Sequence, residues 1–415
     1  MIENRRLLII GYVWPEPKSS AAGIRMMQLI EIFKDNDWEI TFASPAANSN
    51  FMFDLESISV NKIAIQLNNK SFDEFILNLM PAAVMYDRFM MEEQFGWRVA
   101  EQCPDALRIL DTEDLHCLRH ARQVAAKEKR LLVQTDLFSD LAKREIASIW
   151  RCDCSLIISE YEMKLLHDVY NVSSTLLYYL PLLVEPITKV KTKKYASFEE
   201  RNHFIFIGNF LHEPNVDAVM FLKKEVWPII RETLPTDQLH VYGAYPSQKI
   251  LELNKPQQGF FVMGRVGDAK AVVEQAKISL APLRIGAGLK GKLIESMQCG
   301  TPYITTTIGS EGINGEQDNK NYIADTAIDF ATAAIKLYSD KKLWQKAQAK
   351  GLQVINSRFD KLLFHQHFMQ HIKTLLSNCD AHRLSNFTGS MLVHHLLNST
   401  KYMSKWIEAK NKTGN

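Results

Sequence analysis

Short apolar runs alternate with amphipathic helical patterns along most of the chain. The apolar runs of the first half include "RLLIIGYV", "WEITFAS", "SVNKIAIQL", "AAVMYD", "LRILDTED" and "CSLIISE". Between them, apolar positions recur at the three- and four-residue spacing of a helix with one buried face. Strands of this kind that alternate with helices are typical of a parallel sheet covered on both faces. The pattern therefore predicts an α/β fold.

The alternation lapses once, over residues 185–202, where "EPITKVKTKKYASFEERN" is charged and lacks apolar periodicity. This segment is predicted to be a linker. A second series of strands and helices follows over 203–360. Two amphipathic helices are expected over about 327–360 and 361–378, with a polar helical tail after them. Because 415 residues exceed what one core usually serves, the prediction is two doubly wound domains, 1–184 and 203–360.

Composition narrows the possible functions. The chain is 46% apolar and 23% charged, with a formal charge of +2, so it offers no broad cationic surface for nucleic acid. The start "MIENRRLLIIGYVWPEP" has too short an apolar run for a signal peptide and is predicted to be a first strand. No apolar stretch approaches the length of a membrane span. These features predict a cytoplasmic protein.

No metal site is predicted. Cys152 and Cys154 form an isolated C-x-C, and the six cysteines are expected to be reduced thiols. His116 and His120 have the i, i+4 spacing that can place two ligands on one helix face, but no third ligand is evident.

The stretch "RIGAGLKGKLIESMQCGTP" (284–302) has the features of a phosphate site. Gly286, Gly288 and Gly291 have the G-x-G-x-x-G spacing of a dinucleotide site, and Glu311 follows about 20 residues later, where that fingerprint places an acidic residue. The loop joins a strand to a helix N-terminus, which attracts any phosphate. Two features disfavour a nicotinamide cofactor: the motif does not follow the first strand of its domain, and a proline and an arginine interrupt the strand before it.

The predicted helix after this loop adds polar candidates. Glu295 lies in its first two turns, where a carboxylate can accept hydrogen bonds from both hydroxyls of a ribose. An acidic residue that merely complements the helix dipole is the alternative. Arg284, Lys290 and Lys292 surround the same N-terminus. Since cations oppose the dipole there, they indicate a bound anion, the alternative being solvated side chains.

Four segments resemble family 4 glycosyltransferases, the retaining, metal-independent group 1 enzymes of GT-B fold. "APLRIGAGLKGKLIESMQCGTPYITTTIGSEGI" is similar to their donor-binding segment, and "FIGNFLHEPNVDAVMFLKKEVWPII" (206–230) to the start of their C-terminal domain. "GYVWPEPKSSAAGIRMMQLIEIF" resembles their first strand and loop, and "ILDTEDLHCLRHAR" (109–122) their Asp-x-His segment. The similarity covers most of 5–375 and is strongest over 203–313.

The resemblance implies an α/β, GT-B architecture, in which two Rossmann-like domains face each other across a cleft. Residues 1–184 would bind the acceptor and residues 203–360 the nucleotide sugar. The helices of 361–415 would pack back toward the N-terminal domain.

The resemblance also implies site residues. His116 would contact the donor sugar, although a histidine bonded to Asp111 or Asp114 is the structural alternative, and Arg284 is the second catalytic candidate. The donor-binding candidates are Gly23, Asn209, Val266, Gly286, Ala287, Gly288, Lys290, Lys292 and Glu295. Two of them depart from the family pattern: Ala287 replaces its first glutamate, and Asn209 replaces its arginine.

The implied function is retaining transfer of a sugar from a nucleoside diphosphate sugar to a hydroxyl, without a metal or a resident cofactor. The expected partners are the nucleotide sugar and an acceptor such as a glycan or lipid-linked sugar, with peripheral membrane contact and no nucleic acid. Two alternatives stay open. Ala287 also suits a relative that binds a nucleotide sugar without turnover. An NAD(P)-dependent oxidoreductase would use the three glycines.

Overall fold

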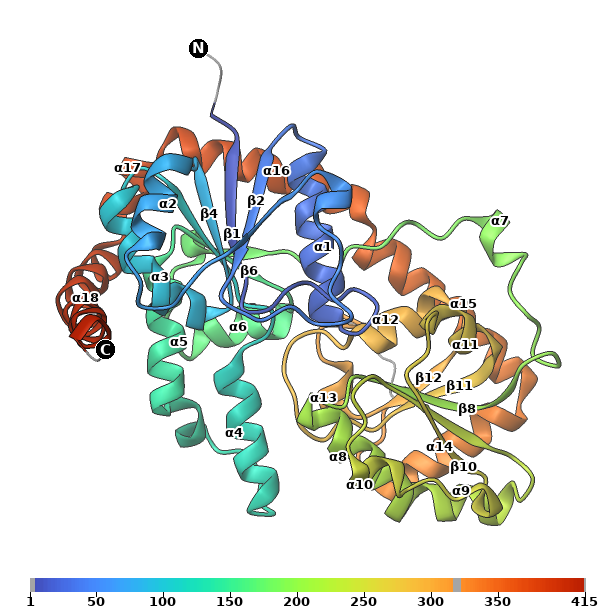
Figure 1. The fold of residues 1–415 in the computed structure, drawn as a ribbon. Helices are drawn as coiled ribbons and strands as arrows, with labels where there is room; N and C mark the ends of the chain where they lie inside the picture. Colours follow the sequence, from blue (N-terminus) through green and yellow to red (C-terminus); the bar gives the residue numbers. More distant parts are fainter. Residues whose placement is uncertain (1–3, 316–321, 414–415) are drawn as a thin grey trace.

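The computed structural model describes residues 4–315 and 322–413 and contains two parallel sheets, each with helices on both faces (Figure 1). The first sheet has seven strands in the order β3-β2-β1-β4-β5-β6-β7. Its strands are β1 (Arg6–Ile10), β2 (Glu39–Ser44), β3 (Asn61–Ala64), β4 (Ala83–Asp87), β5 (Leu107–Asp111), β6 (Cys154–Ile157) and β7 (Leu177–Tyr179). The strand order reverses between β1 and β4, which opens a crevice at their carboxyl ends.

The helices of the same chain segment lie around this sheet: α1 (Ala21–Lys34), α2 (Ser71–Leu79), α3 (Phe89–Gln102), α4 (His116–Lys127), α5 (Asp140–Arg151) and α6 (Glu160–Asp168). The apolar side chains on the two faces of the strands belong to two separate hydrophobic cores. In β1, Leu8 and Ile10 belong to one core, and Leu7 and Ile9 to the other. Burial on both faces explains why the strand is an unbroken apolar run.

The second sheet has five strands in the order β10-β9-β8-β11-β12. They are β8 (Asn202–Ile207), β9 (Leu239–Tyr242), β10 (Phe260–Gly264), β11 (Ala276–Ala281) and β12 (Tyr303–Thr305). Around them lie α8 (Glu213–Phe221), α9 (Trp227–Thr233), α10 (Gln248–Leu251), α11 (Ala269–Gln275), α12 (Gly291–Gln298), α13 (Thr307–Ser310), α14 (Ala327–Ser339) and α15 (Lys341–Val354). The predicted α/β fold with two parallel sheets is confirmed.

The chain crosses between the two sheets twice at one point. After β7, the amide of Val184 donates to the carbonyl of Phe359 at 2.7 Å, and the amide of Lys361 donates back to Val184 at 2.9 Å. The first crossing leads through the short α7 (Lys189–Thr192) to β8. The second leads into α16 (Lys361–Ser377). The two connecting segments therefore lie side by side where they pass between the domains, an arrangement typical of a hinge.

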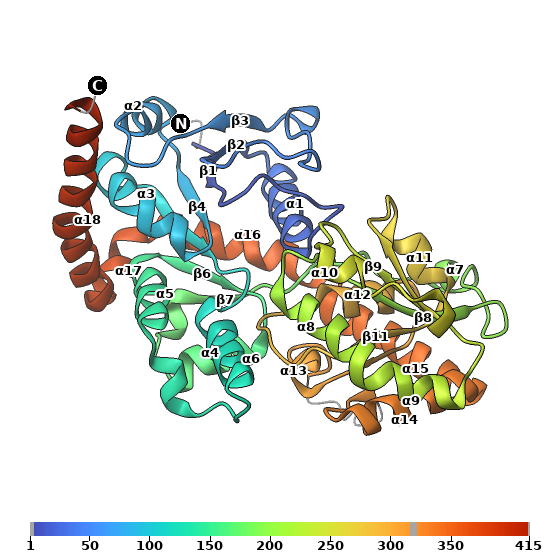
Figure 2. The same ribbon diagram turned by 60° about the horizontal axis from the view of Figure 1, so that its bottom comes forward.

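The C-terminal helices lie on the first domain (Figures 1 and 2). Phe368 and Ile372 of α16 are buried in the same core as Leu7 and Ile9. After α17 (Cys379–Ser385), the long α18 (Phe387–Thr413) packs along α3 and α5 at the outer edge. None of the described helices is long and apolar enough to cross a bilayer.

Two predicted boundaries are wrong. The helix expected over 327–360 is broken at Asp340, whose side chain accepts from the amide of Leu343 at 3.0 Å and starts a new helix. The strand expected from "SVNKIAIQL" is reduced to Asn61–Ala64 at the sheet edge.

Candidate functional site

A cleft of about 1540 Å³ separates the two domains. The loops that follow β1, β4 and β5 form one wall, and the loops that follow β8, β9, β10 and β11 form the other. Both walls are therefore built from the carboxyl ends of parallel strands, the usual ligand position in α/β proteins. A cleft of this size is large enough for two substrates of moderate size.

The glycine loop lies in the second wall, between the end of β11 and the start of α12. Gly286 and Gly288 have φ values of 132° and 65°, which residues other than glycine rarely adopt. Gly291 faces the first domain, because a Cβ there would lie 2.9 Å from the Cβ of Ala21. The N-terminus of α12 therefore meets the N-terminus of α1, and both present positive dipole ends to the cleft (Figure 1).

Lys290 and Lys292 are the cations of this wall. The Lys290 ammonium donates to the carbonyls of Ala287 at 3.0 Å and Gly288 at 2.7 Å, so it braces the loop from within. The Lys292 ammonium donates to the side chain of Asn215 and lies 4.3 Å from the centre of the Phe206 ring. Burial lowers the pKa of Lys290 to about 8 and that of Lys292 to about 7, the latter helped by the neighbouring Lys290 charge. Both amines are thus poised to gain charge when an anion enters.

Glu295 lies one turn further along α12 and lines the cleft. Among the described residues, none donates a hydrogen bond to its carboxylate. Burial raises its pKa, an effect that the Lys270 charge opposes. A half-buried carboxylate with open acceptor sites suits a pair of ligand hydroxyls.

His116 begins α4 in the opposite wall. Its backbone amide and that of Cys117 donate to the carboxylate of Glu145 at 3.0 and 2.8 Å, which satisfies two free N–H groups of the helix start. The imidazole lies edge-on to Phe89 with ring centres 5.6 Å apart, and its Nε2 is 3.6 Å from the Asp114 carboxylate. Burial lowers the pKa of His116 to about 4, so at neutral pH it is an uncharged hydrogen-bonding group.

The other donor-binding candidates divide between ligand and packing positions. Gly23, Asn209 and Val266 all line the cleft. A Cβ on Gly23 would lie 2.4 Å from the backbone of Glu16, so that glycine is required for packing the first loop. Asn209 crosses the interface, because its side-chain amide donates to the carbonyl of Ser19 at 3.2 Å.

Ala287 is 6% exposed and belongs to a hydrophobic core of the first domain. Because it touches both that core and the cleft, a glutamate here would bring a charge against apolar side chains. An alanine at this position therefore suits the close packing of the two domains, where the glutamate of the family pattern would not.

Two candidates are not where the sequence suggested. Arg284 was expected at the catalytic centre, but it is exposed outside the cleft, where its guanidinium donates to Asp217 at 3.0 Å and stacks on Phe221. Gly288 does not line the cleft either, and its amide donates to the buried Glu162 at 2.8 Å. Neither group is free to reach a donor from this position.

Glu311, which the dinucleotide hypothesis would place on a ribose, has a different partner. Its carboxylate pairs with the guanidinium of Arg122 at 2.8 Å in a largely buried contact. The structure thus removes the acidic residue that the nicotinamide alternative needs.

The C-terminal sheet and its helices match a known family model. Residues 201–340 match the model of the "Glycosyl transferases group 1". The chain carries a group 1 glycosyltransferase domain. The resemblance expected from the sequence is confirmed for this domain, and with it the predicted transferase class. No curated protein sequence matches the chain.

Solved structures extend the likeness to both domains. Sucrose-phosphate synthase from Thermosynechococcus elongatus aligns with 90% of this chain and 100% of its own, at 14% identity and a TM-score of 0.65. A glycosyltransferase from Rickettsia africae covers 91% and 100%, at 11% identity and a TM-score of 0.64. Anabaena HepE, solved with UDP and glucose, covers 89% and 99%, at 12% identity and a TM-score of 0.62. This likeness confirms the predicted GT-B fold.

Four further residues of this cleft were not expected from the sequence. His212, which precedes α8, and His120 both line it. The sequence marked His120 only by its i, i+4 spacing from His116, and no motif marked His212. Burial lowers the pKa of His212 to about 4. Asp87 ends β4 and Glu113 follows β5 in the crevice of the first sheet, and burial raises the pKa of both carboxyl groups. Their position at strand ends was the available signal.

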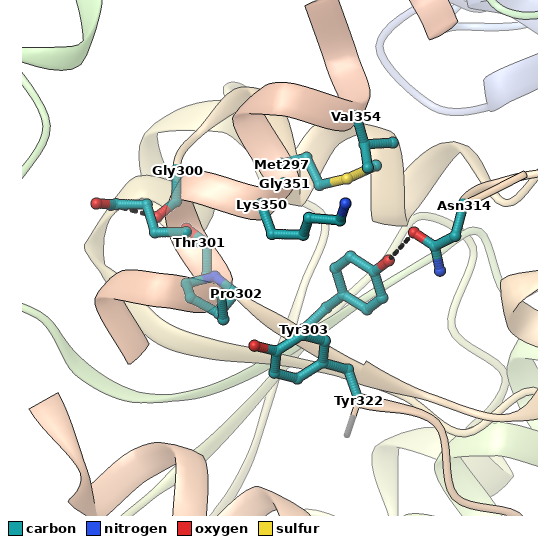
Figure 3. Close-up of a pocket in the computed structure, with 12 residues that line it drawn as sticks. Met297, Gly300, Thr301, Pro302, Tyr303, Asn314, Tyr322, Lys350, Gly351 and Val354 are labelled. Carbon is teal, nitrogen blue, oxygen red and sulfur yellow. Dashed lines mark hydrogen bonds between the residues drawn. The ribbon is translucent and has the colours of Figure 1, made fainter. Parts of the chain in front are cut away.

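Elsewhere in the described residues, candidate sites are weak. A second cavity of about 10 Å³ lies beside Tyr303, Asn314 and Tyr322, where the Tyr303 hydroxyl bonds to Asn314 at 3.2 Å (Figure 3). Its volume is that of roughly one water molecule. No group of three or more His, Cys, Asp or Glu side chains with metal-binding geometry occurs in the described part.

Proposed function

We propose that this glycosyltransferase moves a sugar from a nucleoside diphosphate sugar to an acceptor hydroxyl, with retention of anomeric configuration and without a metal or a resident cofactor. One observation carries the proposal. Lys292 and Glu295, on the first turns of α12, face the same cleft as the neutral His116 of the other domain. That arrangement supplies a cation for a diphosphate, a carboxylate for a ribose and a hydrogen-bonding group for a sugar.

The chemistry asks the protein mainly to stabilise a leaving group. As the bond from the sugar to the diphosphate breaks, negative charge grows on the phosphate oxygens. The N-terminus of α12 and the Lys292 ammonium are positioned to stabilise that charge. The positive charge on the sugar is balanced by the departing diphosphate on the same face, which favours retention.

The shape of the cleft supports transfer over hydrolysis. Its two walls come from different domains, and the chain crosses between them at the hinge beside Val184. Closure over the donor excludes water before the acceptor reacts. The solved structure of Anabaena HepE with UDP-glucose supports a nucleotide sugar as donor for this fold.

A thermal-shift screen tests the proposal. The panel is UDP, GDP, ADP and their common sugar conjugates, together with NAD and NADP, each with and without EDTA. A ligand that binds only the folded state raises Tm by mass action. We expect a rise with one nucleoside diphosphate that EDTA does not change. A rise with NAD or NADP alone would overturn the proposal.

Stereochemistry and turnover need a second assay. With the donor identified, ¹H NMR of the product reports the anomeric configuration, and inversion would refute retention. Donor binding without turnover on any acceptor would favour the non-catalytic alternative, which Ala287 supports because it supplies no carboxylate to the donor loop.

The setting of the reaction is also inferred. We propose a cytoplasmic enzyme acting on a glycan or lipid-linked acceptor, supported by six cysteines that are all free thiols. Peripheral membrane contact is assigned to α18, where Tyr402 and Trp406 are exposed beside Lys405. Co-sedimentation with phosphatidylglycerol vesicles tests it; the contact is refuted if binding does not fall in a Tyr402→Ala/Trp406→Ala variant.

A further inference from the structure

The first domain holds the glycine loop of the second domain by two of its backbone groups. From α4, the Arg122 guanidinium donates to the carbonyl of Gly286 at 2.7 Å. From α6, the Glu162 carboxylate accepts from the amide of Gly288 at 2.8 Å. Two backbone groups of the loop are thus hydrogen-bonded to side chains that lie 164 and 126 positions away in the chain.

Both contacts are buried and belong to stronger networks. The Arg122 side chain is 6% exposed and also forms the ion pair with Glu311, so two groups of the second domain, the Gly286 carbonyl and the Glu311 carboxylate, meet one guanidinium. Glu162 is fully buried, and the same oxygen accepts from the amide of Leu115 at 2.9 Å. Hydrogen bonds without competing water fix geometry more firmly than exposed ones, and the charge of the Arg122 guanidinium strengthens its own bonds further.

The loop has little rigidity of its own. Two of its residues are glycines at positive φ, and the Lys290 ammonium bonds only to the carbonyls of Ala287 and Gly288. The loop also packs tightly on the first domain, since a Cβ on Gly288 would lie 2.7 Å from the Asp114 Cβ. Its conformation therefore depends on the neighbouring domain.

The contacts leave specific backbone groups for a ligand. Among the described residues, none accepts a hydrogen bond from the amide of Gly286 or Ala287, and both residues line the cleft. The opposite groups of the loop are already occupied by Arg122, Glu162 and Lys290. Two adjacent amides beside a helix N-terminus match the oxygens of a phosphate.

We propose that Arg122 and Glu162 are positioning residues that shape the donor loop across the domain interface, so that the amides of Gly286 and Ala287 bind the outer phosphate of the donor only when the domains are closed. This inference rests on the proposed function of the cleft. If Arg122 and Glu162 have this role, the affinity for the diphosphate depends on the first domain, whereas the affinity for the nucleoside does not.

A comparison of each nucleoside diphosphate with its monophosphate measures the contribution of the outer phosphate to binding. Dissociation constants are measured by calorimetry for UDP, GDP and ADP and for the corresponding monophosphates, with the wild type and an Arg122→Met variant. For the base that the wild type prefers, the variant is expected to bind the diphosphate at least tenfold more weakly and the monophosphate within twofold of wild type. A role in stability alone would weaken both ligands alike, and that result would overturn the proposal.

Glu162 provides a second variant pair in case Arg122→Met does not fold. Glu162→Gln keeps an acceptor oxygen of the same size and is expected to bind like wild type. Glu162→Leu removes the acceptor and is expected to lose diphosphate affinity selectively, with faster hydrogen exchange at 285–289. Equal diphosphate binding by both Glu162 variants would overturn the proposal.

A matched control breaks another ion pair between the domains. Arg358 donates to Glu160 of α6 at 2.6 Å and does not touch the glycine loop. Arg358→Met is expected to leave the ratio of diphosphate to monophosphate affinity unchanged. If the wild type binds no nucleotide, the proposed function fails. If it binds both ligands and the Arg122 and Glu162 variants keep the wild-type ratio, only the positioning role fails.

Discussion

The two walls of the cleft use opposite chemistry. The wall of the second domain presents a helix N-terminus, the buried Lys290 and the partly buried Lys292 within a few residues of sequence. The wall of the first domain presents the neutral His116 and the carboxyl groups of Asp87 and Glu113, which come from separate strand ends. The comparison indicates a division of tasks. Under the proposed function, one wall would hold a diphosphate, and the other would meet a sugar and an acceptor hydroxyl.

Removing the cation of the second wall is expected to have the largest effect. Lys292→Ala should lower kcat/KM by roughly 10²–10³-fold, because a preorganised charge at the leaving group is lost. Steady-state kinetics with the nucleotide sugar measure it. The matched control is Lys224→Ala, an exposed lysine on the outer surface. Loss of activity in the control, or wild-type activity in Lys292→Ala, would contradict the assignment of this wall.

Glu295 tests whether the same wall also holds the ribose. Glu295→Ala should weaken donor affinity by roughly 1–3 kcal/mol, the cost of leaving ligand hydroxyls unpaired. Calorimetric titration with the nucleoside diphosphate gives the value. The exposed Glu232→Ala is the control and should bind as wild type does. An unchanged dissociation constant in a folded Glu295→Ala protein would remove Glu295 from the donor site.

His116 tests the first wall by the opposite kinetic pattern. His116→Ala should lower kcat roughly tenfold to hundredfold while leaving donor affinity nearly unchanged, because a hydrogen bond that matters during transfer is lost. The exposed His167→Ala serves as the control. A lower Tm with normal kcat would return His116 to a structural role.

Donor affinity should also depend on pH through the lysines. Burial holds the pKa of Lys292 near 7 and that of Lys290 near 8 in the free protein. A bound diphosphate favours the charged amines, so binding takes up protons and affinity falls as pH rises above 7, by up to about tenfold per pH unit for each group. Calorimetry between pH 7 and 9 in buffers of different ionisation enthalpy measures it. A flat profile without proton uptake would refute the role of both amines.

The smallest effect is expected outside the cleft. Arg284→Ala removes an exposed ion pair with Asp217, so kcat/KM should change less than twofold and stability by at most about 1 kcal/mol. Kinetics and thermal denaturation check it. A large loss of activity would show that Arg284 moves into the cleft during the reaction.

The wall of the second domain could be predicted from the sequence better than the wall of the first, because its residues are close together in the chain. Gly286, Lys292 and Glu295 lie within one strand–loop–helix unit, so local spacing alone brings them together. Arg284 fails for a local reason: Leu283 and Ile285 on either side are buried, and the residue between them points outward.

The first wall and the contacts between the domains depend on topology. Asp87 and Glu113 meet because β4 and β5 are neighbours, which the strand ends "MYD" and "TED" hinted at. The bond from Arg122 to Gly286 joins residues 164 positions apart. No local pattern in a single sequence specifies such a contact, because it is set by how two finished domains dock.

A crystal structure with the nucleoside diphosphate that most raises Tm would show directly which wall of the cleft binds the phosphates. We expect its phosphates within hydrogen-bond distance of the Lys292 ammonium and the amides of Gly286 and Ala287, with its ribose on Glu295. A nucleotide bound away from α12, or lying along the crevice of the first sheet, would contradict this expectation.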